Sequence, residues 1–300
     1  MSNKVAYSPK KDDLFNPGRR EGFFDEGRAS EAVLCANMAR LAYCRMEPEF
    51  EFDRSRIQEN LKRVGFTSCD FFESHGTAAG KGIHCFLALR ETGERTAIVA
   101  FRGTDVKDLH DLWYDIDCEQ ILWSKGGRVH KGFSDALAQV QQRVLEALQS
   151  IGNSRLVYTG HSLGAAMATL LASLLPPYAL YTFGSPRVGD AAFAATVANL
   201  KSYRYVDCCD RVAQVPPEFM GYKHVGDPYY IDRRRIIRFN PGVKDISADQ
   251  SKATVKYWLR YSLLPGNVWA RGFADHAPVN YIWPIAAAEP ERGLAAEARN

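Results

Sequence analysis

The sequence lacks several features that would assign it to a specialised class of protein. Its seven cysteines are an odd number without CxxC spacing, which fits neither a complete disulfide framework nor a zinc site. The amino terminus has no apolar segment of the kind found in secretory signals, so we expect a cytoplasmic location. A peripheral location at a membrane is the alternative. Basic residues number 38 against 35 acidic residues, an excess too small for a general attraction to nucleic acid.

A long stretch without charge is the clearest departure from average composition. No Asp, Glu, Lys or Arg occurs from Leu156 to Pro186, a length that would allow a membrane span. Glycines and the pair Pro176-Pro177 interrupt the stretch, so we do not expect a lipid-facing helix. The chain as a whole is 46% hydrophobic and 24% charged, which excludes a collagen-like or largely disordered protein.

The order of apolar segments predicts an α/β fold, with a mostly parallel central sheet and helices on both faces. No repeat or linker divides the chain, so we expect a single domain over residues 1–300. At its ends, residues 1–28 predict a surface arm and the Ala/Glu-rich residues 286–300 predict a frayed tail. The expected elements are a helix capped by Ser30, a second helix around residues 57–64, a hairpin at 83–89 and 96–101, helices at 132–149, 163–175 and 190–199, strands at 155–159, 179–183 and 203–207, an edge hairpin at 229–239 and a helix at 251–264.

One of these strands runs into Gly160-His161-Ser162-Leu163-Gly164 and then into an alanine-rich helix. G-x-S-x-G between a strand and a helix indicates a nucleophile elbow, a strained turn that presents the serine hydroxyl above the sheet. We therefore predict that Ser162 is a catalytic nucleophile, the alternative being an incidental serine in a tight turn. The N–H of Leu163, at the start of the helix, is expected to stabilise an oxyanion.

A catalytic serine needs a general base and a carboxylate that orients the base, and in this arrangement they follow in the chain order Ser, Asp, His. Asp207 and Asp210 both lie at the end of a predicted strand, and we favour Asp210 because it lies in the loop beyond the strand. His224 and His276 are the downstream histidines. We favour His276 because the longer intervening segment lets the chain return to the site.

The loop after the strand at 96–101 is expected to supply a second oxyanion donor. Gly103 permits a bend there, and Thr104 offers a backbone N–H and a hydroxyl.

These motifs, taken in order, resemble those of the class 3 lipase family, which comprises fungal-type lipases and related esterases. The resemblance implies an α/β-hydrolase fold that needs no metal or organic cofactor. It also implies the same roles for the residues: Ser162, Asp210 and His276 as catalytic residues, and Thr104 and Leu163 at the oxyanion hole. The stretches that carry the resemblance are residues 100–104, 129–133, 159–166, 182–189, 210–212, 215–217 and 275–276.

The activity implied is hydrolysis of acylglycerol or other fatty-acyl esters through an acyl-enzyme on Ser162. A phospholipase A1 or a feruloyl-type esterase would use the same machinery, and a catalytically silent binding module of this fold is a further alternative. The partner expected is an ester or lipid small molecule, with a transient lipid contact and no nucleic acid. The missing signal segment and the unpaired cysteines favour a bacterial-type lipase or esterase.

The resemblance further implies a lid over residues 104–129, for which an ordinary packed surface helix is the alternative. A second amphipathic segment carries Lys252, Lys256 and Arg260 at intervals of four beside apolar residues. That helix would either contact a lipid surface or pack on the domain with its basic stripe in water. In the lid segment at 104–129, four apolar residues are able to share one face of a helix: Val106, Leu109, Leu112 and Trp113.

Overall fold

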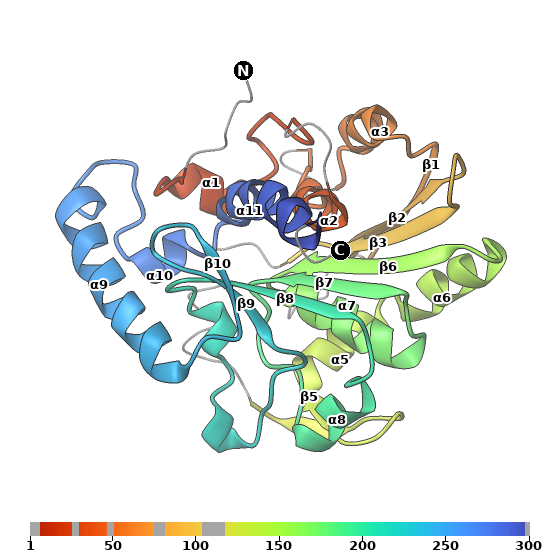
Figure 1. Ribbon diagram of the computed structural model, residues 1–300. Helices are drawn as coiled ribbons and strands as arrows, with labels where there is room; N and C mark the ends of the chain where they lie inside the picture. The colour runs from red at the N-terminus through yellow and green to blue at the C-terminus, as the bar shows by residue number, and fades with distance from the viewer. Residues whose placement is uncertain (1–6, 26–29, 47–50, 75–81, 104–117, 298–300) are drawn as a thin grey trace.

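The centre of the molecule is an eight-stranded sheet in the order β1-β2-β3-β6-β7-β8-β9-β10 (Figure 1). The computed structural model describes residues 7–25, 30–46, 51–74, 82–103 and 118–297. The sheet strands are β1 Ser68–Glu73, β2 His84–Arg90, β3 Thr96–Phe101, β6 Arg155–His161, β7 Ala179–Phe183, β8 Ser202–Asp207, β9 Pro228–Ile231 and β10 Ile237–Phe239, and a separate hairpin pairs β4 Gln120–Leu122 with β5 Arg128–His130. The helices are α1 Lys11–Phe15, α2 Glu31–Leu41, α3 Arg54–Arg63, α5 Lys131–Ala138, α6 Gln141–Ser150, α7 Leu163–Leu174, α8 Ala191–Thr196, α9 Val243–Tyr261, α10 Arg271–Ala274 and α11 Val279–Glu297.

The middle of the sheet is parallel and its edges are antiparallel. Strands β3, β6, β7, β8 and β9 pair in parallel, whereas β1, β2 and β10 join them antiparallel. Helices cover both faces, with α2 and α11 against one and α5 and α7 against the other (Figure 1). The prediction of an α/β-hydrolase fold with a mostly parallel sheet is therefore confirmed.

The charge-free stretch forms strand β6, helix α7 and strand β7 at the centre of this arrangement. All residues of β7 and nearly all of α7 are buried, because helices cover the sheet on both sides. None of the described helices combines the length and the apolar character that a membrane crossing requires.

Several elements differ from the prediction. The helix expected at 132–149 is divided into two helices, α5 and α6, because the backbone turns at Val140. The side chain of Val140 is nevertheless buried in the same cluster as those of Leu137 and Val144. Helix α9 begins well before residue 251, and strands β1, β4 and β5 had not been expected. Helix α11 continues to Glu297 and so includes most of residues 286–300, the segment that we expected to fray.

The described part of the amino-terminal arm packs into the structure instead of only lying over its surface. Residues 11–15 form α1, and Phe23 is completely buried. Ser8 exchanges two hydrogen bonds with the side chain of Asn280, from its N–H to Oδ1 at 2.7 Å and from Nδ2 to its carbonyl at 2.8 Å. The hydroxyl of Tyr7 donates to Asp275 at 2.8 Å. The two ends of the chain are thus joined beside His276.

Candidate active site

The turn at Ser162 has the backbone geometry of a strained elbow. Ser162 has φ 60° and ψ −129°, a combination that costs a non-glycine residue about 1–3 kcal/mol. Strand β6 and helix α7 lie so close together at this turn that glycine is required on both sides of Ser162. A Cβ on Gly160 would lie 2.3 Å from the carbonyl of Gly164, and one on Gly164 would lie 2.3 Å from the carbonyl oxygen of Phe101. The glycines of the motif therefore permit close packing of α7 against β6 and β3.

The hydroxyl of Ser162 is completely buried and has no hydrogen-bond partner among the described residues. Its backbone N–H is held by the carbonyl of Phe183 at 3.0 Å, which fixes the turn against the end of β7. Leu163 is the first residue of α7, so its N–H has no acceptor within the helix and points out of the helix start. A free hydroxyl beside a free N–H is the pair that acyl transfer uses.

Asp210 and His276 form a buried hydrogen-bonded pair at the carboxyl edge of the sheet. The imidazole Nδ1 lies 2.8 Å from Oδ2 and 3.0 Å from Oδ1 of the carboxylate, and since a carboxylate only accepts, Nδ1 carries the proton. Both residues are 1% exposed. The remaining ring nitrogen, Nε2, has no partner among the described residues and is the atom that would accept a proton.

Two further donors hold the carboxylate of Asp210, and neither was foreseen. The N–H of Val212 donates to Oδ1 at 2.8 Å, and the hydroxyl of Tyr281 donates to Oδ2. The pKa of Tyr281 lies well above its ordinary value because the ring is buried and because Asp210 is nearby, so the hydroxyl keeps its proton. The only sequence signal was the position of Tyr281 five residues after His276, which is weak by itself.

Gly184, at the end of β7, makes room for this group. Its φ is +57°, and a Cβ there would lie 2.6 Å from the carboxylate of Asp210 and 3.0 Å from Nδ1 of His276. Any other residue at this position would push the acidic and basic side chains away from their places.

The contacts of His161, the residue before the nucleophile, show how it supports the site. Nε2 lies 2.7 Å from the carbonyl oxygen of His276 and must donate to it, which leaves Nδ1 to accept the hydroxyl of Tyr43 at 2.8 Å. Burial, and in second place the charge of His276, hold the pKa of His161 well below 6.5, so the ring is neutral. The residue before the nucleophile therefore holds the backbone of the residue that carries the base.

The alternative candidates have other partners. Asp207 receives both of its 2.7 Å hydrogen bonds from Nη1 of Arg235, and this pair is buried. Burial alone would lower the pKa of Arg235, but the carboxylates of Asp207 and Asp275 outweigh it and raise the pKa. His224 donates from Nε2 to the carbonyl of Ala213 at 2.8 Å. Asp207 meets the group around His276 only through its backbone N–H, which donates to the hydroxyl of Tyr281 at 3.3 Å, and its carboxylate is committed to Arg235.

The second oxyanion donor and the first part of the predicted lid segment fall on residues that the structure does not describe. The rest of the segment, residues 118–129, is described and holds strand β4 and the start of β5. Thr104 and the lid residues Val106, Leu109, Leu112 and Trp113 all lie within residues 104–117. The residue before Thr104 is placed: a Cβ on Gly103 would lie 2.6 Å from the carbonyl of His161 and 3.0 Å from Cβ of Ser162. The loop that follows β3 thus starts in contact with the elbow.

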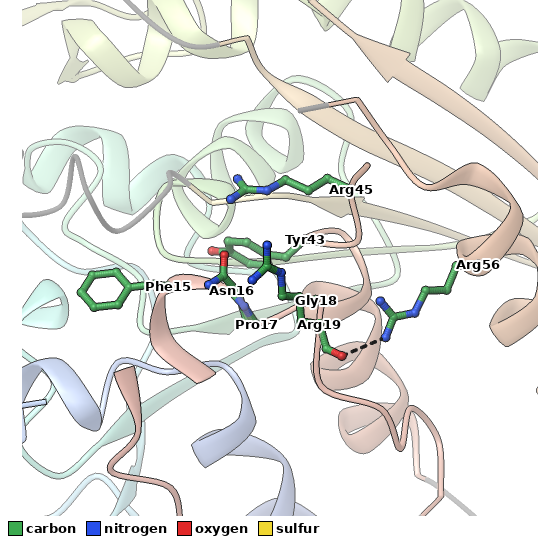
Figure 2. Close-up of a pocket in the computed structure, with 8 residues that line it drawn as sticks. All are labelled: Phe15, Asn16, Pro17, Gly18, Arg19, Tyr43, Arg45 and Arg56. Atoms are coloured by element: carbon green, nitrogen blue, oxygen red, sulfur yellow. Dashed lines mark hydrogen bonds between the residues drawn. The ribbon is translucent and has the colours of Figure 1, made fainter. Parts of the chain in front are cut away.

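A separate pocket lies in the amino-terminal part of the chain (Figure 2). Tyr43 links it to the site, because its ring lines the pocket and its hydroxyl contacts His161. Across the pocket wall, a guanidinium nitrogen of Arg56 donates to the carbonyl of Arg19 at 3.3 Å (Figure 2). The lining residues are Phe15, Asn16, Pro17, Gly18, Arg19, Tyr43, Arg45 and Arg56.

Cys208, Cys209 and Asp275 are the one group of described residues with the spacing of metal ligands. The carboxylate of Asp275 is already occupied, by Tyr7 on Oδ1 and by Arg271 and the N–H of Cys209 on Oδ2. Hydrogen bonding to Cys209 and burial raise the pKa of Cys208, which keeps the thiol protonated. A protonated thiol is a poor metal ligand, so this group is better described as a buried hydrogen-bonded cluster.

Known proteins resemble the chain in both sequence and structure. The family model described as Lipase (class 3) matches residues 98–220, which include β3, the elbow and Asp210. A secreted mono- and diacylglycerol lipase 1 of Fusarium solani is 38% identical over 217 residues, which cover 60% of this chain and 64% of the relative. A lipase of Rhizomucor miehei is 33% identical over 162 residues, 48% of this chain and 44% of that protein. The crystal structure of a lipase from Rhizopus microsporus var. chinensis superposes with a TM-score of 0.54 at 27% identity, over 68% of this chain and 76% of that one.

The chain thus spans less than two thirds of the length of these two curated relatives. Their names also correct one expectation. A cytoplasmic location is contradicted, because the Fusarium solani relative and a Penicillium cyclopium relative are both named as secreted lipases. Residues 98–220, which hold β3, the elbow and Asp210, match the class 3 lipase family model, and the likeness in fold extends over 68% of this chain.

Proposed function

We propose that this protein is a serine carboxylester hydrolase that cleaves acylglycerols or other fatty-acyl esters. The observation that carries the proposal is the elbow geometry of Ser162 together with a buried Asp210–His276 pair whose Nε2 has no partner among the described residues. The elbow and the pair adjoin, because the ring of His161, the residue before Ser162, lies 4.4 Å from the ring of His276. The likeness to proteins named as mono- and diacylglycerol lipases supports an acylglycerol as the ester.

In the proposed reaction, the hydroxyl of Ser162 attacks the ester carbonyl while Nε2 of His276 takes its proton. Asp210 holds the imidazole in the tautomer that leaves Nε2 able to accept, and it stabilises the imidazolium that forms. The N–H of Leu163 stabilises the oxyanion, and we assign the second donor to Thr104. His276 then protonates the leaving alcohol, and water activated by the same ring releases the fatty acid from Ser162.

We also propose that residues 1–300 act as one α/β-hydrolase domain and that residues 104–129 cover the acyl pocket when the site is closed. A covering segment would shield the apolar acyl pocket from bulk water in the closed state and would open to admit the ester. The start of this segment at Gly103, in contact with the elbow, supports the assignment.

Substitution of the nucleophile tests the proposal. Ser162→Ala should lower the hydrolysis of p-nitrophenyl esters by at least ~10³-fold and abolish labelling by a fluorophosphonate, with unchanged circular dichroism. Ser173→Ala is the matched control, because this serine lies on the same helix and its hydroxyl bonds only to Leu170 and Trp123. Near-normal turnover by Ser162→Ala would refute the proposal and favour a catalytically silent module.

Rates on a series of substrates separate the ester classes. We expect acylglycerols with long chains to be preferred over phospholipids and over feruloyl esters. A preference for the sn-1 ester of phospholipids would assign the protein as a phospholipase A1 instead.

A further inference from the structure

Helix α9 carries large apolar side chains on the face that points away from the protein. Trp258 and Leu259 lie three and four residues after Val255, so all three share one side of the helix. Trp258 is 59% exposed and Leu259 is 72% exposed, while the opposite side of the helix is buried through Ala253 and Tyr257. The apolar residues are therefore not part of the core.

The apolar surface continues into the loop after α9. Leu263 is 82% exposed and Trp269 is 69% exposed, and Leu264 between them is also exposed. The loop is fixed to the helix, because the hydroxyl of Tyr257 donates to the carbonyl of Val268 at 2.7 Å. We call Val255, Trp258, Leu259, Leu263, Leu264 and Trp269 the α9 surface.

A row of cations borders this surface on one side. Lys252, Lys256 and Arg260 are exposed and lie at intervals of four, one helical row away from Val255 and Leu259. No Asp or Glu occurs in the sequence between Asp249 and Asp275. Within residues 250–274, the α9 surface is therefore apolar at its centre and bordered by cations with no carboxylate among them.

Contacts lead from this surface to the catalytic pair. Helix α9 stands at the edge of the molecule with α10 beside it (Figure 1). Arg271 of α10 donates to the carbonyl of Ala253 at 3.3 Å and forms a buried ion pair with Asp275 at 2.9 Å. Asp275 precedes His276 in the chain. The α9 surface and the base are thus joined through one short, buried segment.

We propose that the α9 surface docks the protein on a lipid surface that carries anionic headgroups, with the three cations on the headgroups and the apolar side chains among the acyl chains. Exposed tryptophan and leucine beside lysine and arginine is the pattern of helices that lie in a membrane interface. A nucleic acid would use the cations but would leave the leucines in water. A second copy of the chain would bring two positive borders together, which opposes dimerisation through this face. The inference rests on the proposed function only in that a lipid substrate is found at such a surface.

Binding to vesicles tests the inference without hydrolysis. The complete protein is sedimented with vesicles of ether-linked phosphatidylglycerol and phosphatidylcholine, which contain no carboxylic ester to cleave. We expect binding to vesicles with phosphatidylglycerol, and little to pure phosphatidylcholine. Salt at 1 M should release the protein, because the screening length falls from about 10 Å at 0.1 M to about 3 Å.

Variants locate the contact. Each cation near an anionic surface contributes about 1 kcal/mol, or about 5-fold, so Gln at Lys252, Lys256 and Arg260 together should weaken partitioning on the order of 100-fold. Leu259→Ser should weaken it about 10-fold. The matched control replaces three exposed lysines elsewhere, Lys62, Lys125 and Lys223, with Gln. It removes the same charge and should change binding less than about 5-fold.

Hydrolysis of a soluble p-nitrophenyl ester should be unchanged in all these variants, because none of the residues contacts the catalytic pair. The inference would be overturned by equal losses in the two triple variants, by binding that does not depend on phosphatidylglycerol, or by a dimer in solution that Leu259→Ser dissociates. Vesicle binding by a protein that fails to hydrolyse any ester would refute the proposed activity and leave the docking surface standing.

Discussion

The hydrogen bond from Tyr281 to Asp210 allows a direct measurement of what holds the acidic residue. Tyr281→Phe removes one oxygen atom from a completely buried ring and leaves the carboxylate of Asp210 with one donor fewer. It also removes the acceptor of a longer hydrogen bond, 3.3 Å, from the N–H of Asp207. A hydrogen bond to a charged group contributes about 1.5–3 kcal/mol, more than a bond between neutral groups. We therefore expect the free energy of unfolding to fall by about 2 kcal/mol at pH 7.5.

Tyr158 provides a matched control for this change. It is also completely buried, but its hydroxyl has no partner among the described residues. Tyr158→Phe removes an unsatisfied polar atom, so it should be neutral or stabilising by up to about 1 kcal/mol. The same chemical change is thus expected to have opposite signs at two positions.

Urea unfolding followed by circular dichroism measures both effects. In an Asp210→Asn background the acceptor is neutral, so Tyr281→Phe should cost only about 1 kcal/mol. Equal costs for Tyr281→Phe and Tyr158→Phe, or an undiminished cost in the Asp210→Asn background, would refute the assigned hydrogen bond.

Three further changes test other parts of the site. Burial holds the pKa values of His161 and His224 well below 6.5, so the unfolded chain takes up protons first as the pH falls. The stability that these neutral rings contribute is complete only well above pH 6.5, and about 2–3 kcal/mol of it should be lost between pH 7.5 and 5.5. Urea unfolding measures this loss, and a flat profile would contradict the buried neutral state. Gly184→Ala should lower kcat for a soluble ester at least ~10-fold, since its Cβ would overlap the catalytic carboxylate, and an unchanged kcat would show that the site tolerates displacement. Arg235→Gln leaves Asp207 buried without its partner and should cost about 3–5 kcal/mol, whereas the double variant with Asp207→Asn should recover most of the loss, and no recovery would refute the pairing.

Local patterns were sufficient to predict the main elements around the elbow. The strand expected at 179–183 coincides with β7, and the helix expected at 163–175 ends one residue earlier as α7. These segments are short, apolar and bounded by glycine or proline, so their period and their ends are visible without tertiary information. The choice of Asp210 over Asp207 also had a local basis, because a residue beyond the strand end can turn towards the carboxyl edge.

The contacts that complete the site were not predictable in the same way. Tyr281 lies 71 residues from Asp210, and Tyr43 lies 118 residues from His161. Their meeting depends on how α11 and the residues after α2 pack on the sheet, and no periodicity encodes such a pairing. The break at Val140 was missed for a related reason, because the apolar pattern continues through it while the backbone turns.

The joining of the two ends of the chain beside His276 determines when the protein can become active during its synthesis. Ser8 bonds to Asn280, which is 272 residues later in the chain and is made after it, and His276 lies in the same segment as Asn280. A ribosome that has released Ser162 and Asp210 has made a nucleophile and an acidic residue without a base. Under the proposed mechanism, a growing chain that has not yet reached His276 cannot hydrolyse lipids, and activity arises only when the segment around Asn280 meets Ser8.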